Sequence, residues 1–254
     1  MFNLRDKVIL VTGASRGIGA AIARACGEAG GSVAVHYGRS RSNAEEVARA
    51  IGPDRSLLLP ADLLDDQAVL DLWRRALAWK GRIDVLINNA GVQLFAGVDS
   101  DFDSWNKALR DTLQVNTFAG AHLAREAIRH FKTRGGGVII TIASQAATQG
   151  VRAPTTMAYA ASKGACKAFA NSIARCYSID NVLSYTINPG LVDTEIAEDF
   201  IRSYGDRQAV LDGFSMGDLV PPEEIGTLCA FLATGQVRHA TGTSVEVTGA
   251  TYIR

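Results

Sequence analysis

Short, continuously apolar runs alternate with longer amphipathic segments along this chain of 254 residues. Runs such as Lys7–Thr12, Ser32–Tyr37 and Asp84–Asn88 are rich in β-branched residues and too short for helices, so we interpret them as buried strands. Strands that are apolar throughout indicate a parallel sheet covered on both faces. Because crossovers between parallel strands are right-handed, the pattern predicts an α/β fold, a doubly wound (Rossmann) sheet of about seven strands with helices on both faces.

The other elements follow the same alternation, and glycine or proline punctuates them. The predicted strands are 7–12, 32–37, 56–60, 84–88, 138–143, 182–188 and 243–247. The predicted helices are 18–29, 43–51 with Asn43 as its cap, 65–79, 101–113, 115–133, 159–178 and 222–233. Since no linker, repeat or low-complexity stretch divides the chain, residues 1–254 are predicted to form one domain.

Composition narrows the classes of partner. The 26 basic and 26 acidic residues balance, which argues against broad attraction to nucleic acid or to an anionic membrane. Four scattered cysteines lack the spacing of a zinc site, so we expect no bound metal and a reducing compartment. The first residues do not resemble a signal peptide, and no run approaches the ~18 apolar residues of a membrane span. A cytoplasmic protein is therefore expected.

A glycine-rich turn separates the first predicted strand from the first helix. Its sequence, Thr12-Gly13-Ala14-Ser15-Arg16-Gly17-Ile18-Gly19, brings three glycines to the point where backbone N–H groups and the helix dipole can meet a pyrophosphate. Such a triplet alone can also be a tight turn, but its place in a βαβ unit favours dinucleotide binding. No Gly-Lys-Ser/Thr follows, so a nucleotide triphosphatase loop is not supported.

This turn resembles the cofactor loop of the short-chain dehydrogenase/reductase family. Further family-like segments follow later predicted strands in order: Asp62-Leu63, Asn88–Gly91, Ser144 with Tyr159-x-x-x-Lys163, and Asn188–Gly190 with Val192 and Thr194. The resemblance extends over nearly the whole chain. Together with strand position, it assigns cofactor binding to Gly13, Ser15, Arg16, Gly17, Ile18, Gly19, Tyr37, Arg39, Asp62, Leu63, Asn89, Ala90, Gly91, Tyr159, Lys163, Pro189, Gly190, Val192 and Thr194.

The catalytic prediction rests on four residues. Tyr159 and Lys163 share one helix face, and a nearby ammonium stabilises a phenolate that can take or give a proton. Ser144 can donate a hydrogen bond to a substrate oxygen. The resemblance adds that Lys163 bonds the nicotinamide ribose and that Asn116 positions a water in a proton relay. Ser144 and Tyr159 are 15 positions apart, so residues 145–158 are predicted to carry a two-residue insertion.

The end of the second predicted strand indicates which cofactor is preferred. NAD enzymes usually place a carboxylate there, on the ribose 2′-hydroxyl. This chain has Tyr37, followed by Gly38 and Arg39, and Arg16 stands in the glycine loop. Two arginines can bind a phosphate bidentately, so we predict that NADP(H) is preferred over NAD(H).

The predicted function is that of an NADP(H)-dependent oxidoreductase interconverting a ketone or aldehyde and an alcohol. A 3-oxoacyl-ACP reductase and a sugar or polyol dehydrogenase remain alternatives, as does a non-catalytic NADP-binding regulator. An α/β-hydrolase is a weaker rival, based on Gly213-Phe214-Ser215-Met216-Gly217 with Asp218 and His239. Residues 191–220 are expected to form a substrate lid, whose apolar residues 196, 200 and 211 cover either substrate or a small core. The resemblance implies a homo-oligomer, tetramer or dimer.

Overall fold

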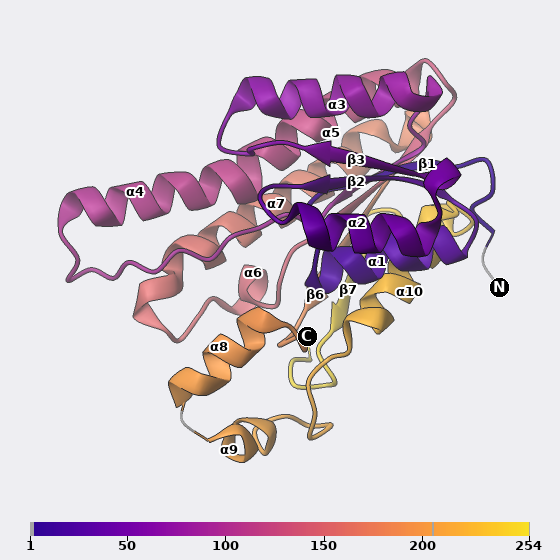
Figure 1. Cartoon of the computed structure of the whole chain (residues 1–254). Helices are drawn as coiled ribbons and strands as arrows, with labels where there is room; N and C mark the ends of the chain where they lie inside the picture. Colours follow the sequence, from indigo (N-terminus) through magenta and orange to yellow (C-terminus); the bar gives the residue numbers. More distant parts are fainter. Residues whose placement is uncertain (1–2, 205, 254) are drawn as a thin grey trace.

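The structure, a computed structural model, describes residues 3–204 and 206–253. The described chain forms one parallel seven-stranded sheet in the order β3-β2-β1-β4-β5-β6-β7 (Figure 1). The strands are β1 (Val8–Val11), β2 (Ser32–Tyr37), β3 (Ser56–Pro60), β4 (Val85–Asn88), β5 (Gly137–Ile142), β6 (Val182–Pro189) and β7 (Ser244–Val247). The doubly wound α/β prediction is confirmed. Residues 1, 2, 205 and 254 of the predicted domain lie outside the described residues.

Helices cover both faces of this sheet. The longer helices are α1 (Gly17–Glu28), α2 (Arg41–Ile51), α3 (Asp66–Lys80), α4 (Phe102–Leu113), α5 (Ala119–Lys132), α7 (Met157–Tyr177), α8 (Glu195–Tyr204) and α10 (Pro222–Ala233). The short ones are α6 (Ala146–Gln149) and α9 (Arg207–Leu211). None of the helices within residues 3–204 and 206–253 is long and apolar enough to cross a bilayer.

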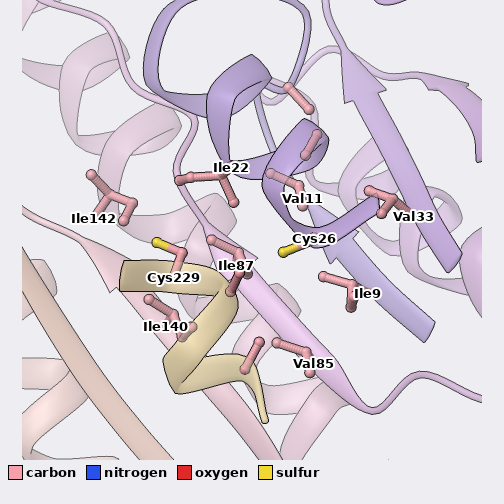
Figure 2. Close-up of a cluster of buried hydrophobic side chains, with 14 of the residues drawn as sticks. Ile9, Val11, Ile22, Cys26, Val33, Val85, Ile87, Ile140, Ile142 and Cys229 are labelled. Carbon is pink, nitrogen blue, oxygen red and sulfur yellow. The ribbon is translucent and has the colours of Figure 1, made fainter. Parts of the chain in front are cut away.

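Alternate residues of each strand point to opposite layers, and this builds the core. Ile9 and Val11 of β1 pack with α1 and α10, where Cys26 and Cys229 meet the same cluster (Figure 2). Leu10, between them, packs in the opposite layer with α3 and α5. Both faces of the central strands are buried, which explains why their sequences are apolar throughout instead of alternating.

Three predicted helix boundaries are wrong in an informative way. The helices expected at 101–113 and 115–133 form one helical path, because the π-helical segment Gln114–Phe118 joins α4 to α5 without glycine or proline to end either. Asn43 is not a cap, since α2 begins at Arg41. Helix α7 begins at Met157, two residues before the predicted start, directly after a turn of 3-10 helix.

The described residues of the segment 191–220 form a small helical excursion beyond β6. Its ends meet where Val192 and Val220 form a parallel bridge. Within it, Ala197, Ile201 and Leu219 are buried together, and Leu211 packs against them. Leu211 is thus part of a small core, one of the two alternatives posed by the sequence. The side chains of Ile196 and Phe200 lie outside the described residues.

Candidate active site

The glycine loop lies between β1 and α1, where the strand order reverses from β1 to β4. Gly13 and Gly17 have φ values of 63° and 50°, which favour glycine. A Cβ on Gly19 would lie 2.1 Å from the Gly13 carbonyl oxygen, and one on Gly13 would lie 2.9 Å from Ala90 Cα. No side chain fits here, so the loop backbone packs directly against the segment after β4 and leaves its other side open to a ligand.

Thr12 and Asn89 fix that packing. The Thr12 hydroxyl accepts from the N–H groups of Asn89 (2.9 Å) and Ala90 (3.0 Å). The Asn89 amide donates in return to the carbonyls of Thr12 (2.8 Å) and Gly13 (3.2 Å). The Asn89 side chain therefore holds the glycine loop in place. Its direct contact with a cofactor stays a prediction. Thr12 is a residue that sequence reasoning missed.

A buried histidine joins the glycine loop to the ends of β2 and β3. His36 is 2% exposed, and its Nδ1 accepts from Gly13 N–H at 2.9 Å. Its Nε2 lies 3.2 Å from the Ala61 carbonyl oxygen. Burial lowers the pKa of His36 to about 4. Sequence reasoning missed this residue, although a polar side chain in the apolar run Val33–Tyr37 was the signal.

The ends of β2 and β3 carry the predicted adenosine-side residues. Tyr37 is 5% exposed and Leu63 is buried, so both side chains lie beneath the surface at this edge of the sheet. Asp62 is exposed, and its carboxylate accepts from Leu64 N–H at 3.0 Å, which closes a turn after β3. Arg39 is exposed just beyond Tyr37. The edge thus presents a guanidinium near a buried ring, and no carboxylate stands at Tyr37.

The segment that follows β6 contacts the glycine loop through two residues, Thr194 and Glu195. A Cβ on Gly17 would lie 3.2 Å from the Thr194 methyl group, so Thr194 faces the first turn of α1. The next residue, Glu195, forms an ion pair with Arg16, and both side chains are largely exposed. In this structure the Arg16 guanidinium is thus directed toward the first turn of α8. Sequence reasoning gave Glu195 no role.

The predicted catalytic pair lies on the first turns of α7. Lys163 is 4% exposed, its ammonium donates to the Ile142 carbonyl at 2.9 Å, and its Nζ is 5.7 Å from the centroid of the Tyr159 ring. Ser144 follows β5 by two residues, is 9% exposed, and accepts from Ala146 N–H at 3.1 Å. The end of β5 therefore anchors Lys163 and carries Ser144, which brings the predicted proton donor, cation and hydroxyl to one strand end.

Asn116 lies in the π-helical segment and ties two other parts of the site together. Its amide donates to the Val92 carbonyl (2.9 Å) and to the Ser162 hydroxyl (2.8 Å), and its Oδ1 accepts from Val92 N–H (2.7 Å). The Ser162 hydroxyl donates to the Tyr159 carbonyl. The Asn116 side chain thus holds helix α7 against the segment after β4, where a Cβ on Gly91 would lie 3.3 Å from Lys163 Nζ.

The end of β6 supplies the opposite wall. Pro189 accepts from Gln145 N–H at 3.0 Å, and Gly190 donates to the Val247 carbonyl at 2.9 Å. Val192 is 5% exposed, and the Thr194 hydroxyl donates to the Val192 carbonyl. The segment after β6 is therefore joined to the ends of both β5 and β7. The predicted insertion between Ser144 and Tyr159 folds as α6 and a 3-10 turn at Pro154–Thr156.

The hydrolase alternative is wrong in its geometry. Ser215 lies in the turns that follow α9, and its hydroxyl donates to the Ala250 carbonyl, after β7 ends. His239 lies in a 3-10 turn before β7 begins, at the opposite edge of the sheet. A nucleophile elbow needs a strand before its serine and a histidine within reach, and neither condition is met in the described part of the chain.

Comparisons with known proteins identify the family of this chain. The sequence profile of the short chain dehydrogenase family matches residues 7–204. A versicolorin reductase of Emericella nidulans is 37% identical over 210 residues, which cover 80% of this chain and 75% of that protein. A 3β-hydroxysteroid dehydrogenase of Eggerthella lenta is 31% identical over 251 residues, 97% of this chain and 94% of the relative.

The fold also has a solved counterpart. A crystal structure from Agrobacterium tumefaciens, provisionally described as a gluconate dehydrogenase, superposes with a TM-score of 0.88. It covers 98% of this chain and 97% of its own, at 22% sequence identity. At that identity the likeness establishes the shared fold and nothing about substrate.

Proposed function

The chain belongs to the short-chain dehydrogenase family, and from this premise we propose that it interconverts a ketone or aldehyde and an alcohol with NADP(H). The observation that carries the proposal is the Lys163 ammonium, fixed on the Ile142 carbonyl and 5.7 Å from the Tyr159 ring centroid, beside Ser144. A phenol, a buried cation and a hydroxyl at the carboxyl edge of the sheet supply what carbonyl reduction needs besides a hydride.

The residues at this edge fit a nicotinamide dinucleotide. Gly13 and Gly19 leave no room for side chains, Gly17 has a φ of 50° that favours glycine, and the N–H groups of the first turn of α1 are available to an anion. Tyr37 and Leu63 would lie against the adenosine end. Thr194 and Lys163 would hold the nicotinamide end. Both ends of an extended dinucleotide are thus provided for along one edge.

When bound, the nicotinamide supplies a hydride in one direction of the reaction and accepts one in the other. The Tyr159 hydroxyl donates a proton to the substrate carbonyl oxygen during reduction and takes it back during oxidation. The Lys163 ammonium stabilises the phenolate between these steps. The Ser144 hydroxyl donates a hydrogen bond to the same oxygen as its charge develops. Asn116 keeps α7 in register with the rest of the site through Val92 and Ser162.

The preference for NADP(H) follows from charge at the adenosine end. Arg39 follows Tyr37 closely and is exposed, and Arg16 of the glycine loop is largely exposed, with its guanidinium paired with Glu195. Two guanidinium groups near the ribose favour a 2′-phosphate, and no carboxylate at position 37 repels it. The opposite result, equal affinity for NADH and NADPH, would contradict this part of the proposal.

An apolar carbonyl substrate is supported better than a sugar. Phe95 and Val98 follow β4 and are 70% and 73% exposed, so this segment offers apolar surface to a ligand. Their segment is joined to the residues before α7 because Ala96 N–H donates to the Thr155 carbonyl at 3.0 Å. The wall beside Tyr159 is thus partly apolar. A 3-oxoacyl-ACP reductase and a polyol dehydrogenase are the alternatives.

Further properties belong to the same proposal. Phe102 of α4, Phe118 of the π-helical segment and Phe169 of α7 are 72%, 50% and 42% exposed. We propose that a second copy of the chain covers these three side chains. The four cysteines, all of which the structure describes, are free thiols. This supports a reducing, cytoplasmic location.

The decisive experiment is a panel of carbonyl substrates with NADPH, followed at the nicotinamide absorbance. It includes polycyclic ketones, 3-oxoacyl thioesters and keto sugars. Turnover that is lost in Tyr159→Phe supports the proposal. Tight NADPH binding without oxidation of NADPH on any substrate would instead indicate a non-catalytic regulator.

A further inference from the structure

Among the described residues of β2, the buried side chains that carry a polar group are His36 and Tyr37, and His36 is the more deeply buried at 2% exposed. An imidazole at 2% exposure in an apolar layer loses solvation, so its retention needs compensating hydrogen bonds. The structure provides them on both ring nitrogens. The partners belong to different loops at the carboxyl edge, one after β1 and one after β3.

The bonds define one protonation state. Gly13 N–H can only donate, so Nδ1 must accept and carries no proton. The Ala61 carbonyl can only accept, so Nε2 must carry the proton. Both contacts are satisfied only by the neutral ring with its proton on Nε2. The pKa of His36, lowered by burial to about 4, is consistent with a ring that stays neutral near pH 7.

The backbone of His36 adds a third contact to the same loop. Its carbonyl accepts from Ala14 N–H at 2.7 Å. The N–H groups of Gly13 and Ala14 are therefore both turned inward, toward β2, and cannot point at a ligand. The N–H groups further along, at the first turn of α1, are the ones left to face an anion. The next residue, Tyr37, accepts from Ala61 N–H at 3.1 Å.

We propose that His36 is a positioning residue for the cofactor. Its hydrogen bonds fix the position of the glycine loop relative to Tyr37 and to the Ala61-Asp62 turn. The inference rests on the proposed function, because these segments are those assigned to the dinucleotide. His36 touches neither hydride nor substrate. Its loss is expected to weaken cofactor binding and to leave the chemical step intact once the cofactor is bound.

The test compares four variants, three at His36 and one at His130, with wild type by fluorescence titration with NADPH at pH 7.5. His36→Ala leaves Gly13 N–H without its partner and should weaken binding about tenfold or more. His36→Asn places an amide oxygen near the Nδ1 position and should bind within about threefold of wild type. In steady-state assays, the KM for NADPH should rise in His36→Ala while kcat at saturating NADPH stays within about twofold.

His130→Ala is the matched control. His130 also accepts a backbone N–H, from Ile83 at 3.3 Å, but this contact precedes β4 at the opposite edge of the sheet. Its loss should lower stability without changing NADPH affinity. If His36→Ala binds NADPH as wild type does, or if His130→Ala weakens binding equally, the positioning role is wrong.

Two further outcomes are distinguishable. Wild-type protein that binds neither NADPH nor NADH overturns the proposed function, whatever the variants do. If His36→Ala does not fold, His36→Asn and His36→Gln decide. The Asn side chain can replace the acceptor for Gly13, whereas the longer Gln side chain replaces the donor to Ala61. If His36→Asn binds NADPH more tightly than His36→Gln does, the proposal is supported. If the two variants bind NADPH equally, or if His36→Gln binds it more tightly, the proposal is contradicted.

Discussion

Arg16 of the glycine loop is paired with Glu195, the first residue of helix α8. The two residues are far apart in sequence and belong to two parts of the site, one proposed for the cofactor phosphate and one for the substrate lid. The pair engages Nη1 of the Arg16 guanidinium, so that nitrogen is not available for a bidentate contact with a phosphate while the pair is formed. If Arg16 binds the cofactor phosphate as proposed, Glu195 competes with the cofactor for it.

Removing that competition should tighten NADPH binding. Glu195→Gln is expected to lower the Kd for NADPH about twofold to fivefold, the range for an exposed ion pair, with little change for NADH. Glu198→Gln is the control, because Glu198 pairs with Arg207 inside the lid. Equal effects of Glu195→Gln on both cofactors would show that the pair does not sense the 2′-phosphate.

The arginines themselves should carry cofactor preference. Arg16→Ala and Arg39→Ala are each expected to weaken NADPH binding about tenfold or more, since hydrogen bonds to charged groups contribute roughly 1.5–3 kcal/mol. NADH binding should change little. Arg129→Ala, which removes an arginine paired with Glu126 in the last turn of α5, away from the proposed cofactor site, is the control. An unchanged ratio of NADPH to NADH affinity in both variants would refute the assignment.

Tyr159→Phe should separate catalysis from binding. The variant keeps the ring that lies near Lys163 Nζ but loses the proton donor, so kcat is expected to fall about 10²–10⁴-fold. The Kd for NADPH should stay close to that of wild type in a fluorescence titration. Tyr177→Phe, at the end of the same helix, should leave turnover unchanged. Loss of NADPH binding in Tyr159→Phe would make the residue structural.

Gly19 tests the loop sterically. Gly19→Ala would force a Cβ to 2.1 Å from the Gly13 carbonyl oxygen, so the loop must shift and cofactor binding should be lost or severely weakened. Gly164→Ala in α7 meets only the Ala147 carbonyl, at 3.7 Å, and should raise stability slightly because Ala favours helix. Titration calorimetry measures the affinity of Gly19→Ala for NADPH, and scanning calorimetry measures the stability of Gly164→Ala. Wild-type affinity in Gly19→Ala would disprove the close contact.

The lowered pKa of His36 should make the stability of the fold depend on pH. Its pKa falls from 6.5 to about 4 on folding, so the unfolded chain takes up the proton first as the pH drops. Stability from this group is complete above about pH 6.5, declines toward pH 4, and levels off below, for a loss of about 3 kcal/mol. Urea unfolding of wild type and His36→Asn from pH 7 to pH 4 should show this loss in their difference. A constant difference would exclude it.

Local patterns account for what could be predicted from the sequence. A strand such as Val8–Val11 is short, apolar and followed by glycines, and each of these signals is contained in neighbouring residues. The doubly wound arrangement followed from the handedness of crossovers between parallel strands. The site residues could be placed because parallel strands end at one edge, so residues after successive strands come together.

Contacts between distant segments could not be read in this way. The bonds of Asn116 to Val92 and Ser162 depend on a π-helical segment, and nothing in the local sequence distinguishes it from an interruption between two helices. The pair of Arg16 with Glu195 depends on the direction of α8. His36 was the exception with a visible signal, a polar residue in an apolar strand, but its partners become known only when β1 and β3 are placed beside β2.

The bridge between Val192 and Val220 has a consequence for how such a protein can change its specificity. The excursion starts and finishes at one place on the sheet, so its length is not constrained by any strand. The entropy of closing such a loop grows only slowly with the number of residues in it. Residues 196–219, beyond Thr194 and Glu195, can thus be exchanged for a longer or shorter segment while the residues proposed to hold the dinucleotide stay unchanged.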